Sequence, residues 1–125
     1  MYQVNSSSQS LAYTAYGSND ASVEQMRVGA HVGHAEVHHR LGVTDRSAWW
    51  DLLGKRLVGL HLHDVRGLTD HRAPGKGDVD FRWLAARIAA ANPLAARTFE
   101  IDQHESDEEV TTGLQLLIDT GCVPG

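Results

Sequence analysis

The chain has 125 residues, of which 42% are hydrophobic and 22% charged, a composition that indicates one folded domain and excludes a wholly disordered protein. Its net charge of −5, with acidic and basic residues interspersed, leaves no basic stripe for a phosphate backbone and disfavours nucleic acid as a partner. A single cysteine, Cys122, excludes an internal disulfide, and no apolar run is long enough for a membrane span, so we expect a cytoplasmic protein without a membrane partner.

The start of the chain differs from the rest in composition. Residues 1–20 are rich in Ser, Asn and Gln and show no sustained hydrophobic period, so we expect an irregular leader followed by a domain over residues 21–125. A helical turn is predicted over residues 21–27. A strand over residues 28–32 comes next, and Gly33 directly after it predicts a turn or a close approach of the backbone.

Strands and helices then alternate along the chain. The last helix opens with a capping box, Ser106 with Glu109 three residues on, and ends at Gly121. The order β-α-β-α-β-α with short connections predicts an α/β fold with parallel strands. Before the last helix, the expected elements are a helix capped by Thr44 or Asp45, a strand over residues 57–62, a helix from Phe81 that stops at Asn92-Pro93, and a strand over residues 97–101.

Seven of the eight histidines lie between residues 31 and 71, and two of them stand at the end of the predicted central strand. Because side chains alternate along a strand, His61 and His63 point to the same face and can converge on one ion or substrate. A neutral imidazole binds a divalent metal through one ring nitrogen, while an acceptor such as Asp64 or Asp102 holds the other. The alternative is that the two rings form only a polar lining.

The neighbouring strands add candidates to this pair. His34 follows the predicted first strand, and Glu100 stands near the end of the third among apolar residues. A carboxylate is costly there unless it is paired or ligates a metal, so we expect Glu100 to be a ligand; the alternative is a salt bridge with Arg97. Three other histidines are expected to be solvated: His38, His39 and His104.

The loop after the central strand carries two cations. Arg66 and Lys76 lie where an anionic substrate would approach, and either could bind a phosphate or carboxylate group. The alternative for each is a solvated charge. The three tryptophans, Trp49, Trp50 and Trp83, are expected to pack, with Trp50 the one that could be exposed.

A resemblance to a known superfamily is carried by four segments: HVGHAEVHHRLG (31–42), HLHDVRG (61–67), DHRAPGKGDVDF (70–81) and TFEID (98–102). In this order they resemble the C-terminal part of sugar phosphate isomerases and epimerases of the xylose isomerase-like TIM-barrel superfamily, which also contains endonuclease IV. The resemblance covers about residues 28–123. It implies a partial TIM barrel, about the last three βα units with parallel strands, and a divalent metal ion (Mn, Mg, Co or Zn) at the barrel mouth.

The resemblance also implies roles for individual residues. Glu100 would be a metal ligand and the catalytic carboxylate, and His34 would contact the substrate in catalysis or act as a further ligand. His31 stands where the superfamily has a ligand aspartate, and a histidine there changes the charge and the metal preference of the site. The remaining expected ligands are His61, His63 and His71, and the residues expected to bind substrate are Asp64, Arg66 and Lys76.

Sugar-converting members of the superfamily use the metal to polarise a carbonyl or hydroxyl group while a carboxylate moves a proton on the adjacent carbon. We therefore expect an isomerase or epimerase for a sugar or polyol, phosphorylated or not. A full barrel has eight strands and about 250 residues, so we expect a site that is incomplete unless a homodimer or a separate N-terminal half completes it. The alternatives are a non-enzymatic truncated half-barrel, an inosose dehydratase-like lyase and an endonuclease IV-like hydrolase.

Overall fold

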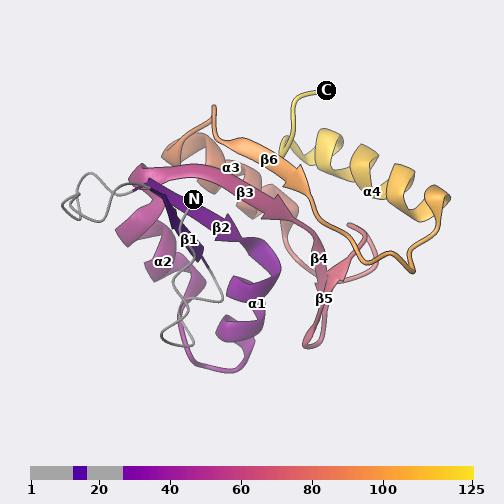
Figure 1. Cartoon of the computed structure of the whole chain (residues 1–125), viewed down its shortest axis with the longest axis horizontal. Helices are drawn as coiled ribbons and strands as arrows, with labels where there is room; N and C mark the ends of the chain where they lie inside the picture. The colour runs from indigo at the N-terminus through magenta and orange to yellow at the C-terminus, as the bar shows by residue number, and fades with distance from the viewer. Residues whose placement is uncertain (1–12, 17–26) are drawn as a thin grey trace.

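Figure 1 shows the strands and helices of residues 13–16 and 27–125, the part of the chain that this computed structural model describes. The chain is a mixed α/β protein. No helix within these ranges is long and apolar enough to cross a membrane. In chain order the elements are β1 (Tyr13–Tyr16), β2 (Arg27–His31), α1 (Val32–Arg40), α2 (Arg46–Leu53), the short 3-10 helix η3 (Gly54–Arg56), β3 (Leu57–Leu62), β4 (Asp64–Arg66), β5 (Thr69–Arg72), α3 (Phe81–Ala91), β6 (Ala96–Phe99) and α4 (Asp107–Thr120).

Four strands form the main sheet in the order β1-β2-β3-β6. Strands β2, β3 and β6 are parallel, as the alternation of strands and helices predicts, and β1 pairs antiparallel with β2. The registers place His31 beside His61 and His61 beside Thr98, so the carboxyl ends of the parallel strands lie level at one edge. The amide of Glu100 donates to the carbonyl of Leu62 at 3.1 Å and continues the ladder past the end of β6.

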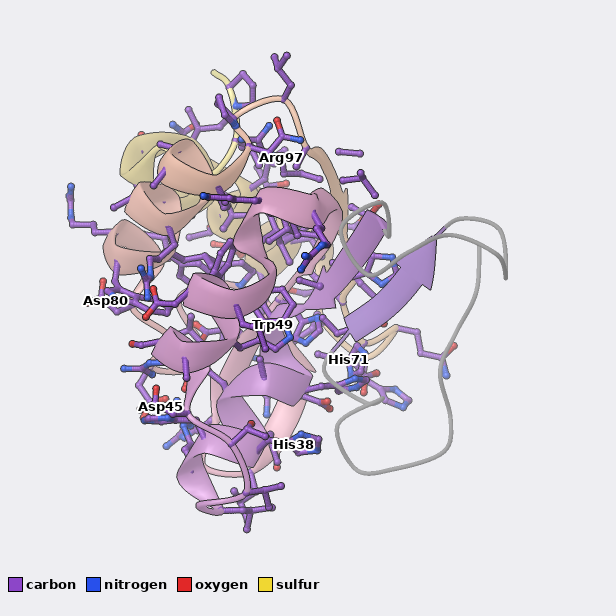
Figure 2. The ribbon with its side chains drawn as sticks, turned by 90° about the vertical axis from the view of Figure 1, so that its left-hand side faces the viewer. His38, Asp45, Trp49, His71, Asp80 and Arg97 are labelled. Atoms are coloured by element: carbon purple, nitrogen blue, oxygen red, sulfur yellow. The ribbon has the colours of Figure 1, made fainter. Side chains whose placement is uncertain are left out.

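Helices cover one face of this sheet, and Figure 2 shows them stacked on a single side of the strands. Leu57, Leu60 and Leu62 of β3 are almost completely buried, and each such side chain contributes about 2 kcal/mol through burial. His61 alternates with two of these leucines and therefore belongs to the opposite face. Most of the remaining large core side chains come from helices or directly follow one: Trp50, Phe81, Leu84, Ile88, Leu117 and Cys122.

The predicted helix starts are confirmed by their caps. Asp45 accepts the amide of Ser47 at 2.7 Å and caps α2. Ser106 and Glu109 form both hydrogen bonds of the predicted capping box, and α4 ends at Gly121, whose φ of 86° suits glycine. Trp50 is 8% exposed and packs in the core, so the expectation that it could be exposed is wrong.

Helix α1 is absent from the elements that the sequence predicts. It begins directly after β2, and its buried side chains include two polar ones, those of Glu36 and His38. A helix that buries polar residues lacks the apolar stripe by which an amphipathic helix is identified. The expectation that His38 is solvated is therefore wrong.

Other boundaries differ from the prediction. The first strand ends at His31, and the third ends at Phe99, so that Glu100 follows it. The loop expected after β3 contains the antiparallel hairpin of β4 and β5. Residues 13–16, within the expected irregular leader, form β1; the rest of that leader and residues 21–26 of the predicted helical turn lie outside the described residues.

Asp64 holds the loop between the hairpin and α3. Its buried carboxylate accepts four backbone N–H groups, from Val65, Gly75, Gly77 and Val79, at 2.8 to 3.0 Å. Such donors compensate the cost of burying the charge. A Cβ on Gly77 would lie 2.5 Å from Oδ1 of Asp64, so glycine is needed for this approach. Asp64 is thus engaged by the loop backbone rather than available to a substrate.

We expect Asp64→Asn to lower the free energy of unfolding by about 2 kcal/mol, because the amide nitrogen would face backbone donors and leave some of them unpaired. Asp80→Asn is the matched control. Asp80 caps α3 through the amide of Trp83 at 3.0 Å, and asparagine caps a helix as well as aspartate does. Urea unfolding of both variants measures the difference, and equal losses would contradict the role given to Asp64.

Candidate metal centre

The parallel strands end in polar side chains that face one another. His31 is the last residue of β2, His61 lies opposite it on β3, and Glu100 directly follows β6. The ring centroids of His31 and His61 are 4.5 Å apart, and Nδ1 of His61 contacts Oε2 of Glu100. One potential ligand atom from each of the three residues lies within 4.8 Å of the others, close enough to hold an ion. The strand register thus assembles a first potential ligand group.

Helix α1 and the hairpin form a second group. His34, in the first turn of α1, places Nε2 3.2 Å from Oδ2 of Asp70 on β5, and Oδ1 of Asp70 is 2.8 Å from Nδ1 of His71. His34, Asp70 and His71 again bring their ligand atoms within 4.8 Å. Asp70 precedes His71 in the segment DHR, the place where the resemblance to endonuclease IV-like members implies further ligands.

His71 and Glu100 connect the groups. Nε2 of His71 is 2.6 Å from Oε1 of Glu100, while the other oxygen of Glu100 faces His61. His63 stacks on His71 at 4.4 Å between ring centroids, and these two with Glu100 form a third potential group. Seven side chains make up what we call the histidine cluster, which includes every expected ligand and catalytic residue: His31, His34, His61, His63, Asp70, His71 (labelled in Figure 2) and Glu100.

His71 has an unusual backbone. Its φ of 59° lies in the left-handed region, which costs a residue with a side chain about 1 kcal/mol. The ring contacts with Asp70 and Glu100 hold it there, and the amide of Asp102 donates to its carbonyl at 2.8 Å. Asp102 therefore supports the cluster through its backbone rather than as the expected side-chain acceptor. Strain of this kind concentrates at functional sites.

Burial keeps two rings of the cluster neutral. Burial first, and then the neighbouring His61, lowers the pKa of His31 to about 4. Burial and the neighbouring His71 lower the pKa of His63 to about 4 as well. Both rings are therefore neutral at pH 7, which is the form in which imidazole binds a metal ion.

Glu100 and His71 have shifts of the opposite kind. Burial alone would raise the pKa of the Glu100 carboxyl, but the hydrogen bond with His71 and the charge of His61 outweigh it and lower the pKa overall. Burial alone would lower the pKa of His71, and its hydrogen bonds with Asp70 and Glu100 reverse this and raise it. The two groups therefore favour an ionised carboxylate beside an imidazolium.

His63 offers the clearest fit to a metal ion. Its side chain is fully buried, and neither ring nitrogen has a hydrogen-bond partner among the described residues. A buried polar group without a partner costs about 1–3 kcal/mol. A Cβ on Gly33 would lie 1.9 Å from Nε2 of His63, so only glycine lets α1 pack this closely, which confirms the predicted close approach. An imidazole-rich donor set with such a nitrogen fits a divalent ion.

Three charged residues considered from the sequence lie outside the cluster. Nζ of Lys76 is 2.7 and 3.0 Å from two glutamates at the start of α4, and Arg66 is exposed on β4. The guanidinium of Arg97 donates to three backbone carbonyls, those of Pro93, Ala95 and Cys122. Glu100 contacts His61 and His71, so the alternative of a salt bridge with Arg97 is wrong.

The other histidines are placed in three different environments. The side chain of His104 is 83% exposed, as expected. His39 is half-buried and accepts the amide of Arg46 at 3.4 Å through Nδ1. His38 is buried on α1, and burial followed by the neighbouring His34 lowers its pKa.

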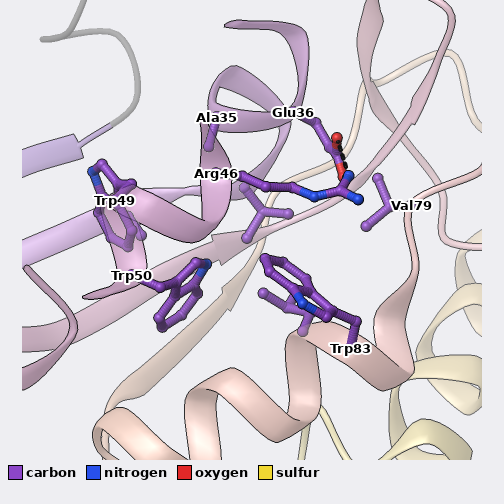
Figure 3. A pocket seen from close by; sticks show the side chains of 10 residues that line it. Ala35, Glu36, Arg46, Trp49, Trp50, Val79 and Trp83 are labelled. Atoms are coloured by element: carbon purple, nitrogen blue, oxygen red, sulfur yellow. Dashed lines mark hydrogen bonds and ion pairs between the residues drawn. The ribbon is translucent and has the colours of Figure 1, made fainter. Parts of the chain in front are cut away.

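A separate apolar hollow lies between α1, α2 and α3 and is walled by three tryptophans (Figure 3). The guanidinium of Arg46 lies 5.0 Å from the ring centroid of Trp83. Its Nη1 donates to both carboxylate oxygens of Glu36, to Oε2 at 2.7 Å. The remaining space of about 20 Å³ holds roughly one water. Its described lining includes no member of the histidine cluster, so the hollow belongs to the packing of the helices.

In the metal-free chain, the histidine rings of the cluster should take up protons at different pH values. As the pH falls, we expect the ring of His71 to titrate above 6.5 and the ring of His63 only near pH 4. Histidine ring resonances followed by NMR, assigned with His63→Gln and His71→Gln, measure the order. A His63 ring that titrates near its ordinary value would contradict its burial.

The same shifts set a dependence of stability on pH. The unfolded chain binds protons on His31 and His63 near pH 6.5, whereas the folded chain binds them near pH 4, so we expect both to reduce stability as the pH falls from about 6.5 towards 4. His71 acts in the opposite sense, because its contribution is present below pH 6.5 and is lost as the pH rises through its raised pKa. Urea midpoints measured across this range check the balance, and a smaller acid loss in His63→Gln would identify that ring as a cause.

Comparison with known proteins gives no significant match: no protein-family model, no curated protein and no solved structure is similar enough to assign a relationship. The resemblance to the xylose isomerase-like superfamily therefore stays a prediction that rests on its motifs. The case for a site at the strand ends rests on the geometry of the histidine cluster.

Proposed function

We propose that the histidine cluster is a divalent transition-metal centre, and that the chain supplies it to an enzyme that transfers a proton between adjacent carbons of a sugar or polyol. The observation that carries this proposal is the convergence of five imidazoles and two carboxylates at the carboxyl edge of three parallel strands. Parallel α/β sheets carry their active sites at this edge. The buried and unpartnered nitrogens of His63 support a metal rather than a purely structural network.

The donor set favours some metals over others. Imidazole nitrogens suit zinc and other late transition metals, whereas magnesium prefers a shell of oxygen ligands. Each of the three ligand groups contains two imidazoles and one carboxylate. Two nitrogens and one oxygen are the protein ligands of many catalytic zinc sites, which keep a further position for water or substrate. Zinc is therefore the first ion to test, followed by cobalt and manganese.

The proton chemistry is assigned to Glu100 and His71. A bound divalent ion would polarise a carbonyl or hydroxyl group of the substrate. Glu100, with its lowered pKa, is ionised at neutral pH and can accept the proton of the adjacent carbon. His71 is hydrogen-bonded to Glu100 at 2.6 Å and has a raised pKa, so with the ion on the group of His31, His61 and Glu100 it can hold a proton for return. Asp70, 2.8 Å from the other nitrogen of His71, orients this ring.

The architecture proposed for the complete protein is a xylose isomerase-like TIM barrel, of which this chain supplies about the last three βα units. Three parallel strands with helices on one face are compatible with such units. A second copy or a separate N-terminal half would supply the remaining strands. A cytoplasmic location belongs to the same proposal, supported by the single buried thiol of Cys122.

A metal-dependent hydrolase of the endonuclease IV kind is the second candidate. The observation that favours it is the presence of three ligand groups, two of which contain His71 and two Glu100, more than a single ion needs. Two or more neighbouring ions stabilise the attacking and leaving oxygens in phosphodiester hydrolysis. The net charge of −5 weighs against a DNA substrate. An inosose dehydratase-like lyase would use Glu100 in the same way, and a half-barrel without activity would show no turnover.

Zinc binding tests the metal centre directly. We expect calorimetric titration to show zinc binding, and we expect Glu100→Gln to weaken the zinc affinity at least tenfold. Substitution of a residue that only hydrogen-bonds to a metal ligand already lowers metal affinity by about 10- to 100-fold. Glu108→Gln, an exposed position in the first turn of α4, is the matched control and should bind zinc as the parent does. Equal affinity in the Glu100 variant would contradict its role. Elemental analysis then counts the ions: one per chain favours the isomerase, and two or more favour the hydrolase.

Hydrogen exchange into substrates tests the proton transfer. We expect the zinc-loaded chain, incubated in deuterium oxide with a panel of ketoses and inososes, to introduce deuterium at the carbon next to the carbonyl group, because Glu100 removes that proton reversibly. Glu100→Gln should abolish the exchange, which proton NMR detects without knowledge of the product. The absence of exchange across the panel at zinc saturation would contradict the proposed reaction for this chain.

A further inference from the structure

We propose that the sheet face opposite the helices carries a substrate groove beside the histidine cluster, and that this groove takes a neutral, unphosphorylated sugar or polyol. The inference rests on the proposed function and narrows its substrate class. It depends on a cavity, on the residues that form its floor and on the distribution of cations around it.

The groove has a volume of about 210 Å³ and crosses three parallel strands. Sites that bury drug-sized ligands have about 300–1,000 Å³, so this groove suits a smaller molecule. It reaches the cluster directly, because two of its lining residues belong to the first ligand group. The lining consists of Gly29, Ala30, His31, Val58, Gly59, Leu60, His61, Ala96 and Thr98.

Two rows of residues form the floor. The strand registers place Gly29 beside Gly59 and Gly59 beside Ala96, so one row across three strands carries almost no side chains. The next row on the same face, two residues on, is His31, His61 and Thr98. The row of Gly29, Gly59 and Ala96 can receive the C–H face of a sugar ring or polyol chain. The row of His31, His61 and Thr98 can bind its hydroxyl groups. A molecule that lies across both rows has one end at His61 and Glu100.

The backbone at Gly59 would accept a residue with a side chain, so neither strain nor a close contact requires glycine at this position of the groove floor. A Cβ there would meet the carbonyl oxygen of Ala96 at 3.6 Å, an ordinary contact, and its φ does not lie in the left-handed region. Glycine inside a strand lowers stability by about 0.5–1 kcal/mol and often marks a place where a ligand approaches the backbone. The absent side chain at Gly59 is therefore best explained by the hollow that it leaves.

Charge selects against a phosphate ester in this groove. No lysine or arginine is among its described lining residues, and residues 1–26 contain neither type. The two cations expected to meet an anion lie elsewhere: Lys76 is paired with Glu105 and Glu109, and Arg66 is exposed on β4. A phosphate group there would lose its hydration without a cationic side chain among the described lining residues, whereas a neutral molecule has no such penalty.

The test compares fructose with fructose 6-phosphate on the zinc-loaded full chain. We expect fructose to shift the amide NMR signals of Gly59 and Thr98, and the phosphate ester to bind at least tenfold more weakly. Tighter binding of the ester would overturn the inference. The absence of any shift with fructose, with other neutral ketoses or with inositol, while zinc remains bound, would also overturn it.

A filled groove provides the matched variant. Gly59→Val places a β-favouring side chain in the hollow, and we expect it to abolish the sugar-induced shifts while the zinc affinity and the unfolding midpoint are maintained. Ala90→Val, at an exposed position of α3, is the control and should keep the sugar response. Sugar binding that survives Gly59→Val would contradict the groove as the sugar site but not the metal centre. The absence of zinc binding in the parent chain would contradict the proposed function itself.

Discussion

The hydrogen bond between His71 and Glu100 is the contact on which the rest of the site depends. It joins residues 29 positions apart and links the hairpin to the end of the main sheet. Glu100 forms one ligand group with His31 and His61, and His71 forms another with His34 and Asp70. The third group contains both Glu100 and His71, so a displacement of either residue would change two of the three groups.

The position of His71 is fixed in turn by side chains that do not belong to the cluster. Glu105 is buried and accepts Nε of Arg72 at 2.8 Å, the amide of Ala73 at 3.2 Å and Nζ of Lys76 at 2.7 Å. The Lys76 hydrogen bond in particular lowers the pKa of Glu105 to about 2, so the carboxylate remains ionised across the ordinary pH range. Lys76 therefore anchors the loop after β5 to the segment that leads into α4, a role that removes it from substrate binding.

The sequence was informative wherever a local rule applied. Alternation of strands and helices predicts the three parallel strands, and the spacing of Ser106 and Glu109 predicts the start of α4. The convergence of His61 and Glu100 follows from the same rule, since parallel strands end at one edge. Helix α1 escaped prediction because two of its buried side chains, Glu36 and His38, are polar. The role of Asp64 escaped it because its partners are backbone amides of a loop, which leave no pattern in the sequence.

Several unfavourable features concentrate at this one edge of the fold. His63 is buried without a described partner, His71 has a left-handed backbone, and Gly59 lies inside a strand that lines the groove. Together they cost a few kcal/mol, a substantial part of the roughly 5–15 kcal/mol that stabilises a domain. The helix-covered face, by contrast, is closely packed. A ligand bound at this edge would offset that cost, since binding to the folded state adds its own free energy to stability.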